Sequence, residues 1–120
     1  MLLFVYGTLM RGMRNHAMMK YGKGDSTHGR ASVQGTLYHL GGFPGLRLEG
    51  TGLVYGELWR VTDESIPEFD RFEGVPHLYT REVVIATPLD SELQVYANTY
   101  VYATDPSEYA QPIEGGQWKE

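Results

Sequence analysis

The sequence contains no cysteine. This absence excludes disulfides, thiolate zinc sites, iron–sulfur ligation and a cysteine nucleophile. It is compatible with a reducing cytosol, where structural disulfides are rare. Any chemistry of the chain must therefore rest on its other side chains and on its backbone groups.

Basic residues are also few, and no hydrophobic run is long. Ten Lys and Arg stand against fifteen Asp and Glu among 120 residues, which gives a formal net charge of −5. Nucleic acids and anionic membranes select for basic patches, so neither is expected as a partner. The apolar segment 1–6 has no basic leader and is too short for a signal peptide or a bilayer span. We therefore expect a cytoplasmic protein.

Motifs for metals and nucleotides are missing as well. The four histidines, His16, His28, His39 and His77, have no tight ligand spacing and no H-E-x-x-H arrangement. The GKGDST segment at 22–27 lacks the pattern of a phosphate-binding loop, and no G-x-S-x-G is present. We expect neither a metal nor an organic cofactor.

What the sequence does contain is a series of short extended segments. They are rich in β-branched and aromatic residues, which favours strands. The predicted strands are residues 1–6, 31–40, 53–61, 78–88 and 92–103. The last two flank a PLDS turn and predict a hairpin. Gly56, inside the third strand, indicates a bend or the close approach of another backbone.

Two short helices and two irregular segments complete the prediction. Residues 12–21 predict a helix that Gly12 and Asn15 weaken, and residues 62–74 predict a second one. Thr62 or Asp63 can cap the second helix, Pro67 fits its first turn and Gly74 can end it. A polar loop, GKGDSTHG at 22–29, and a turn, GGFPGL at 41–46, are also expected.

These elements favour an α+β fold. Strands joined by short turns predict a small mixed or antiparallel β-barrel, with the short helices flanking it. The length and the absence of linkers or repeats predict a single domain over residues 1–120.

The VYGTL segment at 5–9 carries one possible site. A buried strand runs into Gly7, which lets a ligand approach the backbone, and Thr8 adds a hydroxyl. Successive N–H groups at the end of a strand can hold an anionic or carbonyl oxygen. The alternative is an ordinary tight turn that leaves the first strand.

Glu73 is the other candidate for a functional site. It follows Phe69 and Phe72 in the last turn of the second predicted helix, on or beside the apolar side. Desolvation there would raise its pKa and suit it to proton transfer at neutral pH. The alternative is a glutamate that points to water, paired with Arg81 or Arg71.

Several segments together resemble the gamma-glutamylcyclotransferase-like family. They are VYGTLMRGMRNH, VQGTLYHLGGFPGL, GLVYGELWRV, DRFEGV with YTREVV, and YVY, in this order along residues 4 to about 102. More narrowly, they resemble the small branch that includes gamma-glutamylamine cyclotransferases and plant avirulence-induced relatives. The combination is specific, although each segment alone is weak.

The resemblance implies a barrel with a cavity at one end, and it assigns roles to residues. It implies that Glu73 is the catalytic residue. The residues to which it assigns substrate binding are Tyr6, Gly7, Thr8, Leu9, Tyr79 and, as a looser match, Tyr102. The implied reaction releases 5-oxoproline and a free amine from a gamma-glutamyl amine or amino acid. It needs no cofactor, and the enzyme is expected to be a monomer or a homodimer.

Two other functions stay open at this stage. The same cavity could hold a small metabolite without turnover, as a binding module. A purely structural or interaction domain is the third possibility, for which the sequence offers no positive sign. The identity of the leaving amine is not encoded in any motif, and Arg11 and Arg81 have no spacing that marks either as a carboxylate partner.

Overall fold

The structure, a computed structural model, describes residues 1–22 and 27–120. The strands are β1 (Leu2–Val5), β2 (Thr27–Gln34), β3 (Thr36–His39), β4 (Pro44–Arg47), β5 (Leu53–Arg60), β6 (Tyr79–Pro88), β7 (Val95–Tyr102) and β8 (Gln111–Pro112). The helices are α1 (Ile66–Glu73) and the 3₁₀ turns η1 (His16–Gly22), η2 (Asp63–Ser65) and η3 (Glu114–Gly116). Of the predicted polar loop, residues 23–26 lie outside the described residues, whereas residues 27–29 belong to β2.

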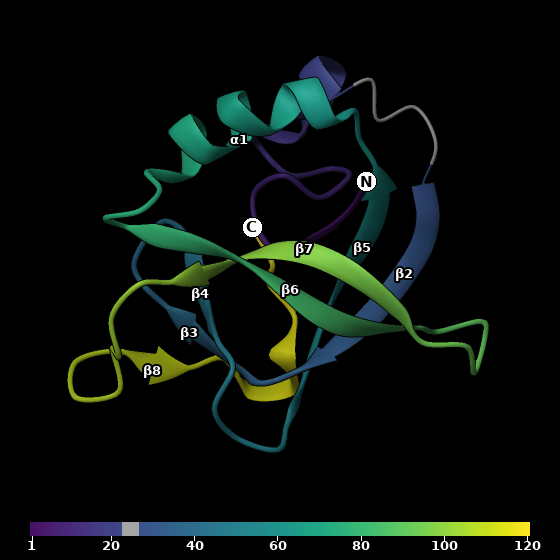
Figure 1. Cartoon of the computed structure of the whole chain (residues 1–120). Helices are drawn as coiled ribbons and strands as arrows, with labels where there is room; N and C mark the ends of the chain where they lie inside the picture. The colour runs from purple at the N-terminus through teal and green to yellow at the C-terminus, as the bar shows by residue number, and fades with distance from the viewer. Residues whose placement is uncertain (23–26) are drawn as a thin grey trace.

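Five strands close into a barrel in the order β1-β5-β2-β6-β7. Neighbours in this order run antiparallel, and a parallel pairing between Leu3 of β1 and Asn98 of β7 closes the ring. β4, β3 and β8 continue the sheet from β7, and α1 lies across the top of the barrel in the view of Figure 1. The prediction of an α+β fold with a small mixed barrel is confirmed, as is the β6–β7 hairpin.

Two strands share one edge of β7. β1 pairs with the middle of β7, through Leu3 and Asn98, and β4 pairs near its end, through Leu46 and Val101. Because β1 ends at Val5, the chain leaves the sheet between these two pairings. The segment that follows β1 is therefore free to form a loop at this opening.

The prediction of a turn over residues 41–46 is wrong in its second half. Pro44 begins β4, at the first position of a strand, where its missing N–H is tolerated. Gly45 lies against β7: an added Cβ would stand 3.1 Å from Cβ of Tyr102. Here the glycine serves close packing rather than a turn, which propensity alone does not reveal.

The first predicted helix, residues 12–21, is also wrong in its extent and type. Successive turns replace its first half, and only the 3₁₀ turn η1 follows. Gly12 has φ +83°, which lies outside the right-handed helical region. Met19 provides the buried anchor of this segment, at 3% exposure, whereas Ala17 is exposed.

The second predicted helix is present but begins later. Residues 63–65 form η2 and α1 starts at Ile66, with Pro67 in its first turn. The expected side-chain cap is absent at Thr62, which instead accepts a hydrogen bond at its carbonyl from Ser65 Oγ, 2.6 Å away. Gly74 ends the helix as predicted, in the left-handed conformation with φ 70°.

The packing of the barrel core explains why residue 56 is a glycine. An added Cβ there would collide with the carbonyl oxygen of Val5 and stand 2.9 Å from Cζ of Phe4. The prediction that another backbone passes close to Gly56 is thus confirmed, and this contact packs β1 tightly against β5. Phe4 is 1% exposed and belongs to the main hydrophobic cluster.

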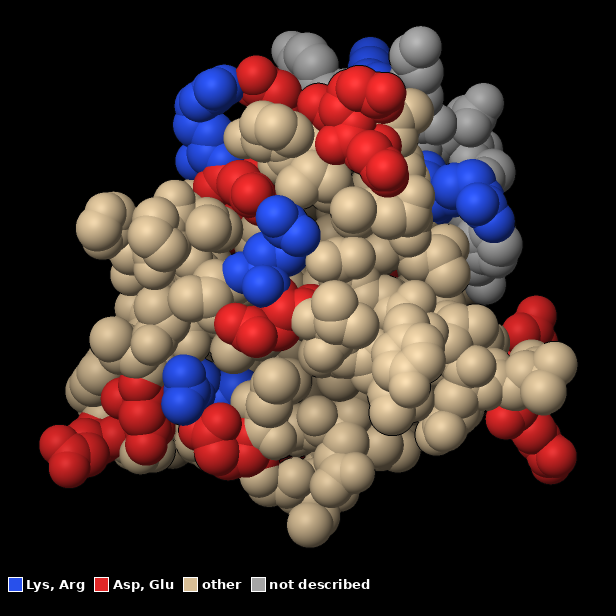
Figure 2. Space-filling view, in the orientation of Figure 1, with Lys and Arg blue, Asp and Glu red and all other residues tan. Residues whose placement is uncertain are grey.

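The surface carries its charges in small groups. On the face shown in Figure 2, Lys and Arg lie as separate groups near Asp and Glu, without a continuous basic area. Among the described residues, no helix has both the length and the hydrophobicity that crossing a membrane requires.

Candidate active site

A cavity of about 200 Å³ opens where β1 and β4 part along β7. Its lining comes from the end of β1 and the following loop, from Phe43 and Pro44, from the last turn of α1 and from tyrosines of β6 and β7. Pockets for drug-sized ligands usually have volumes of roughly 300–1,000 Å³. A cavity of this size suits a small metabolite or one end of a larger one.

The loop after β1 lines this cavity and has backbone N–H groups without an acceptor in the described part of the chain. Met10 N–H donates to the carbonyl of Gly7 over 3.1 Å, which makes residues 7–10 a tight turn. The two central N–H groups of such a turn, here those of Thr8 and Leu9, take no part in its hydrogen bond. Within residues 1–22 and 27–120, no oxygen accepts a hydrogen bond from the N–H groups of residues 7–9. These donors are available for an oxygen of a ligand.

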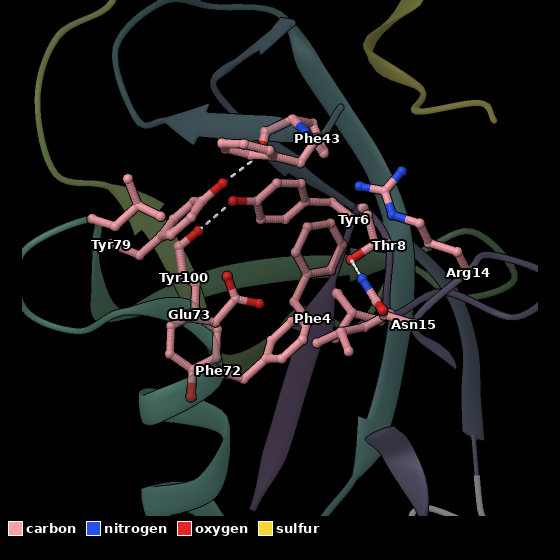
Figure 3. Close-up of a pocket in the computed structure, with 15 residues that line it drawn as sticks. Phe4, Tyr6, Thr8, Arg14, Asn15, Phe43, Phe72, Glu73, Tyr79 and Tyr100 are labelled. Carbon is pink, nitrogen blue, oxygen red and sulfur yellow. Dashed lines mark hydrogen bonds between the residues drawn. The ribbon is translucent and has the colours of Figure 1, made fainter. Parts of the chain in front are cut away.

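Two residues hold this loop in shape. Asn15 N–H donates to the carbonyl of Thr8 over 2.9 Å, and Asn15 Nδ2 donates to Thr8 Oγ1 over 3.0 Å (Figure 3). His16 Nδ1 lies 2.9 Å from the carbonyl oxygen of Leu9. Because Asn15 already donates to the oxygen of Thr8, the hydroxyl proton of Thr8 is left to point elsewhere, and both residues line the cavity.

Two tyrosine hydroxyls form hydrogen bonds to backbone groups of β4 and β7, at the place where β1 and β4 part. Tyr6 Oη donates to the carbonyl of Tyr100 over 2.6 Å and accepts from the N–H of Leu46 over 3.2 Å. Tyr79 Oη donates to the carbonyl of Pro44 over 2.6 Å. Both hydroxyls are engaged with the backbone, and burial raises the pKa of each well above its usual range. The two tyrosines therefore stay neutral. Tyr6 fastens the end of β1 to β4 and β7, and Tyr79 fastens β6 to β4.

Glu73 stands at the last position of α1, where the helix end is tightly built. The N–H of Gly74 donates to the carbonyl of Arg71 over 3.1 Å, and the N–H of Val75 donates to the carbonyl of Asp70 over 3.0 Å. This pair of bonds with a left-handed glycine is a Schellman motif, which closes a helix at a defined residue. The motif turns the chain away directly after Glu73, and the Glu73 side chain lines the cavity.

The carboxyl of Glu73 has no ion-pair partner among the described residues. Arg71 instead pairs with Glu68 at 2.7 Å, and Arg81 pairs with Asp70 at 3.0 Å. Loss of hydration in the cavity raises the pKa of Glu73 from 4.5 to about 7. A carboxyl with this pKa can both accept and return a proton at neutral pH.

The comparisons with known proteins agree with this geometry. A family model described as gamma-glutamyl cyclotransferase, AIG2-like, matches residues 3–120. The chain belongs to this family. The members of this cyclotransferase family act on small gamma-glutamyl compounds.

Individual members of the gamma-glutamyl cyclotransferase family are similar along much of the chain. The gamma-glutamylaminecyclotransferase of Homo sapiens is 33% identical over an alignment of 132 positions, which covers 92% of this chain and 84% of the human protein. The gamma-L-glutamyl-butirosin B gamma-glutamyl cyclotransferase of Niallia circulans is 43% identical over 72 residues, or 59% of this chain and 44% of that protein. The crystal structure of an AIG2-like protein from Mus musculus superposes with a TM-score of 0.80 at 26% identity, over 94% of this chain and 85% of the mouse chain.

The structure of this cyclotransferase family member gathers most of the residues that the sequence singled out. Those that line the cavity are Tyr6, Gly7, Thr8, Leu9, Glu73 and Tyr79. Tyr102 is not part of the lining; its ring packs edge-on against Tyr79, with the ring centres 5.4 Å apart. Tyr100, two residues earlier on β7, lines the cavity instead.

Sequence reasoning missed three polar residues of the cavity: Arg14, Asn15 and Tyr100. Asn15 had a signal, since an amide six residues after the YGTL segment can fold back onto its hydroxyl. Arg14 donates to the carbonyl of Gly42 and pairs with Glu120 at 3.4 Å. In the described part of the chain, no group of three or more His, Asp or Glu side chains is placed to hold a metal ion.

Proposed function

We propose that this protein is a gamma-glutamyl cyclotransferase that converts a gamma-glutamyl amine or gamma-glutamyl amino acid into 5-oxoproline and a free amine. One observation supports this function above all. A carboxyl with a pKa near 7 and no partner shares a small cavity with backbone N–H groups that have no acceptor among the described residues. Family membership supports the same reaction class.

The reaction is internal to the substrate. The α-amine nitrogen attacks the γ-carbonyl carbon, a new C–N bond closes a five-membered lactam, and the old amide C–N bond breaks. Glu73 accepts a proton from the attacking amine and delivers one to the departing nitrogen, so it ends in its starting state. No water is consumed. The atoms balance as one substrate, one lactam and one amine.

The cavity needs few groups for this chemistry. Nucleophile and electrophile are already joined, and well-oriented intramolecular reactions reach effective molarities of about 10⁵–10⁸ M. The N–H groups of Gly7, Thr8 and Leu9 hold oxygens of the glutamyl part and can stabilise an oxyanion as it forms. Arg14, a cation in the cavity lining, lies away from Glu73 in Figure 3 and can attract a substrate carboxylate.

The test is a release assay with a panel of gamma-glutamyl amino acids and gamma-glutamyl amines, followed by mass spectrometry of 5-oxoproline. For the accepted substrate, we expect kcat/KM to rise with pH through about 7, because Glu73 must be ionised to accept a proton. A limb near pH 4.5, the ordinary value of a glutamate, would contradict the role of the desolvated carboxyl. Equal binding of a ligand to the protein and to its Glu73→Gln variant, with no lactam from either, would favour a binding module.

Replacing Gly7 with Ala is expected to lower kcat/KM about 10–100-fold, because small misplacements in a site have such effects. The new Cβ would stand 2.7 Å from Cγ of Pro44, closer than real contacts allow, so the loop or β4 must move. Gly42→Ala is the control, since its added Cβ would stand 3.7 Å from Nη2 of Arg14 and meet only ordinary contact. Steady-state kinetics of both variants test this prediction. An equal loss of kcat/KM in both variants would contradict the assigned role of Gly7.

A further inference from the structure

We propose that Asp70 is a positioning residue for Glu73: its carboxylate fastens the end of α1 to β6 and β7 and keeps Arg81 occupied. The proposal rests on the proposed function in that Glu73 is the proton-transferring group. It assigns a role to a cluster at the edge of the cavity, formed by Asp70, Arg81 and Tyr100 with Asn98 beside it, of which only Tyr100 lines the cavity.

The contacts of this cluster are specific. Arg81 Nε donates to Asp70 Oδ1 over 3.0 Å, and Tyr100 Oη donates to the same oxygen over 2.8 Å. Arg81 Nη1 also donates to Asn98 Oδ1 over 3.3 Å. Arg81 and Tyr100 are direct cross-strand partners on β6 and β7, so one carboxylate of α1 bonds both strands at one register position.

The same residue also belongs to the motif that ends the helix. The carbonyl of Asp70 accepts the N–H of Val75, which is the bond of the Schellman motif that spans more residues of the chain. Asp70 lies three residues before Glu73, so the two side chains project from neighbouring positions of the helix surface. The side chain of Asp70 therefore fixes where the last turn sits, and its carbonyl fixes where that turn stops.

The cluster is only partly exposed, which gives it energetic weight. The side chain of Asp70 is 25% exposed and that of Arg81 is 33% exposed, whereas Arg71 and Glu68, the other ion pair of α1, are 72% and 53% exposed. Exposed pairs of this kind contribute little to stability. The Asp70 cluster adds a buried tyrosine, at 3% exposure, as a second donor.

Arg81 is the cation that this arrangement controls. The hydrogen bond to Asp70 raises the pKa of Arg81 further, so its charge is permanent. A free arginine beside a desolvated carboxyl would favour the charged form of that carboxyl. Asp70 compensates the charge of Arg81, and desolvation is the cause that raises the pKa of Glu73. Arg71 cannot take the same part, since positions two apart on a helix do not face each other.

The titratable and charged groups around Glu73 come from every element near it. Those that line the cavity with Glu73 are Tyr6 directly after β1, Arg14 of the following loop, Tyr79 of β6 and Tyr100 of β7. Asp70 and Arg71 precede Glu73 on α1, His77 follows the helix, and Arg81 of β6 pairs with Asp70. The tyrosines stay neutral, because burial raises the pKa of all three. Arg81 is thus the group that loses its ion-pair partner on α1 when Asp70 is neutralised.

The test measures the ionisation of Glu73 directly by ¹³C NMR of glutamate carboxyl carbons, with the Glu73 signal identified by its loss in Glu73→Gln. In the wild-type protein we expect a midpoint of about 7. In Asp70→Asn we expect it to fall to about 6 or lower, from the freed arginine and from better hydration of a loosened helix end. Glu68→Gln, which breaks the exposed pair of the same helix, should leave the midpoint at the wild-type value.

The rate of 5-oxoproline release provides the second measurement. At pH 7, Asp70→Asn should lower kcat for 5-oxoproline release about 10–100-fold with KM little changed, because the misplaced group is the proton carrier and not the substrate-binding loop. A wild-type midpoint in folded Asp70→Asn would overturn the proposal. If Asp70→Asn does not fold, Tyr100→Phe decides: a midpoint below the wild-type value supports the proposal, and one at or above it overturns it. No lactam from the wild type, with the midpoints as expected, would refute the proposed function alone.

Discussion

Glu73→Gln is expected to reduce the rate of 5-oxoproline release by about 10²–10⁴-fold, the usual contribution of a positioned acid or base. Glutamine keeps the shape of the side chain and its place at the end of α1, but it cannot accept a proton. Substrate should still bind, since the loop after β1 is untouched. Single-turnover assays and calorimetry of substrate binding measure the two effects separately. A Gln variant with wild-type turnover would remove Glu73 from the mechanism.

The same variant should be more stable than the wild type at high pH. The folded state raises the pKa of Glu73 from 4.5 to about 7, so ionisation opposes folding. Above pH 7 this costs up to about 3 kcal/mol, at 1.36 kcal/mol for each pKa unit. In the wild type the penalty is absent below pH 4.5 and grows as pH rises from 4.5 to 7. Thermal unfolding at pH 5 and pH 8 tests this, and a gain that is equal at both values would contradict it.

Tyr6→Phe is expected to lower the free energy of unfolding by about 2–6 kcal/mol. The hydroxyl of Tyr6 bridges the carbonyl of Tyr100 and the N–H of Leu46, in a side chain that is 6% exposed. Its removal leaves two buried backbone groups without this partner, and each such group costs about 1–3 kcal/mol. Urea unfolding measures the loss. Tyr96→Phe is the matched control, because this tyrosine of β7 is 74% exposed.

This variant also separates two roles for Tyr6. The hydroxyl holds β1 and β4 to β7 at the place where the cavity opens, so the structure gives it a framework role. A substrate contact would appear differently, as a raised KM in a protein of wild-type stability. That outcome would contradict the framework role.

The barrel strands followed from the sequence because their pattern is local. Alternating β-branched and aromatic residues defined β5, β6 and β7, and a glycine inside such a pattern, Gly56, indicated either a bend or the close approach of another backbone, of which the structure shows the second. The turn assigned to residues 41–46 failed for the opposite reason. Pro44 and Gly45 fit a strand only because β7 lies beside them, and a long-range partner leaves no local signal.

The site residues that could be predicted are those whose residue type is unusual at their position in the sequence. A glutamate after two phenylalanines at a helix end, and a YGTL segment after a buried strand, stood out as residue types in unexpected places. Tyr100 did not stand out from Tyr102, because the strand pattern does not say which part of β7 borders the cavity. Asp70 likewise reads as one more helix carboxylate, and only the fold brings Arg81 and Tyr100 to it.

The most direct test of the account is the fate of the substrate's γ-carbonyl in water enriched in ¹⁸O. Internal attack by the α-amine predicts unlabelled 5-oxoproline and a free amine in equal amounts, because no water enters the reaction. Hydrolysis would instead give glutamate with ¹⁸O in its γ-carboxyl. Unlabelled lactam from the wild type, released about 10²–10⁴-fold more slowly by Glu73→Gln, is the result that the account predicts. Labelled glutamate as the product would contradict the cyclotransferase mechanism.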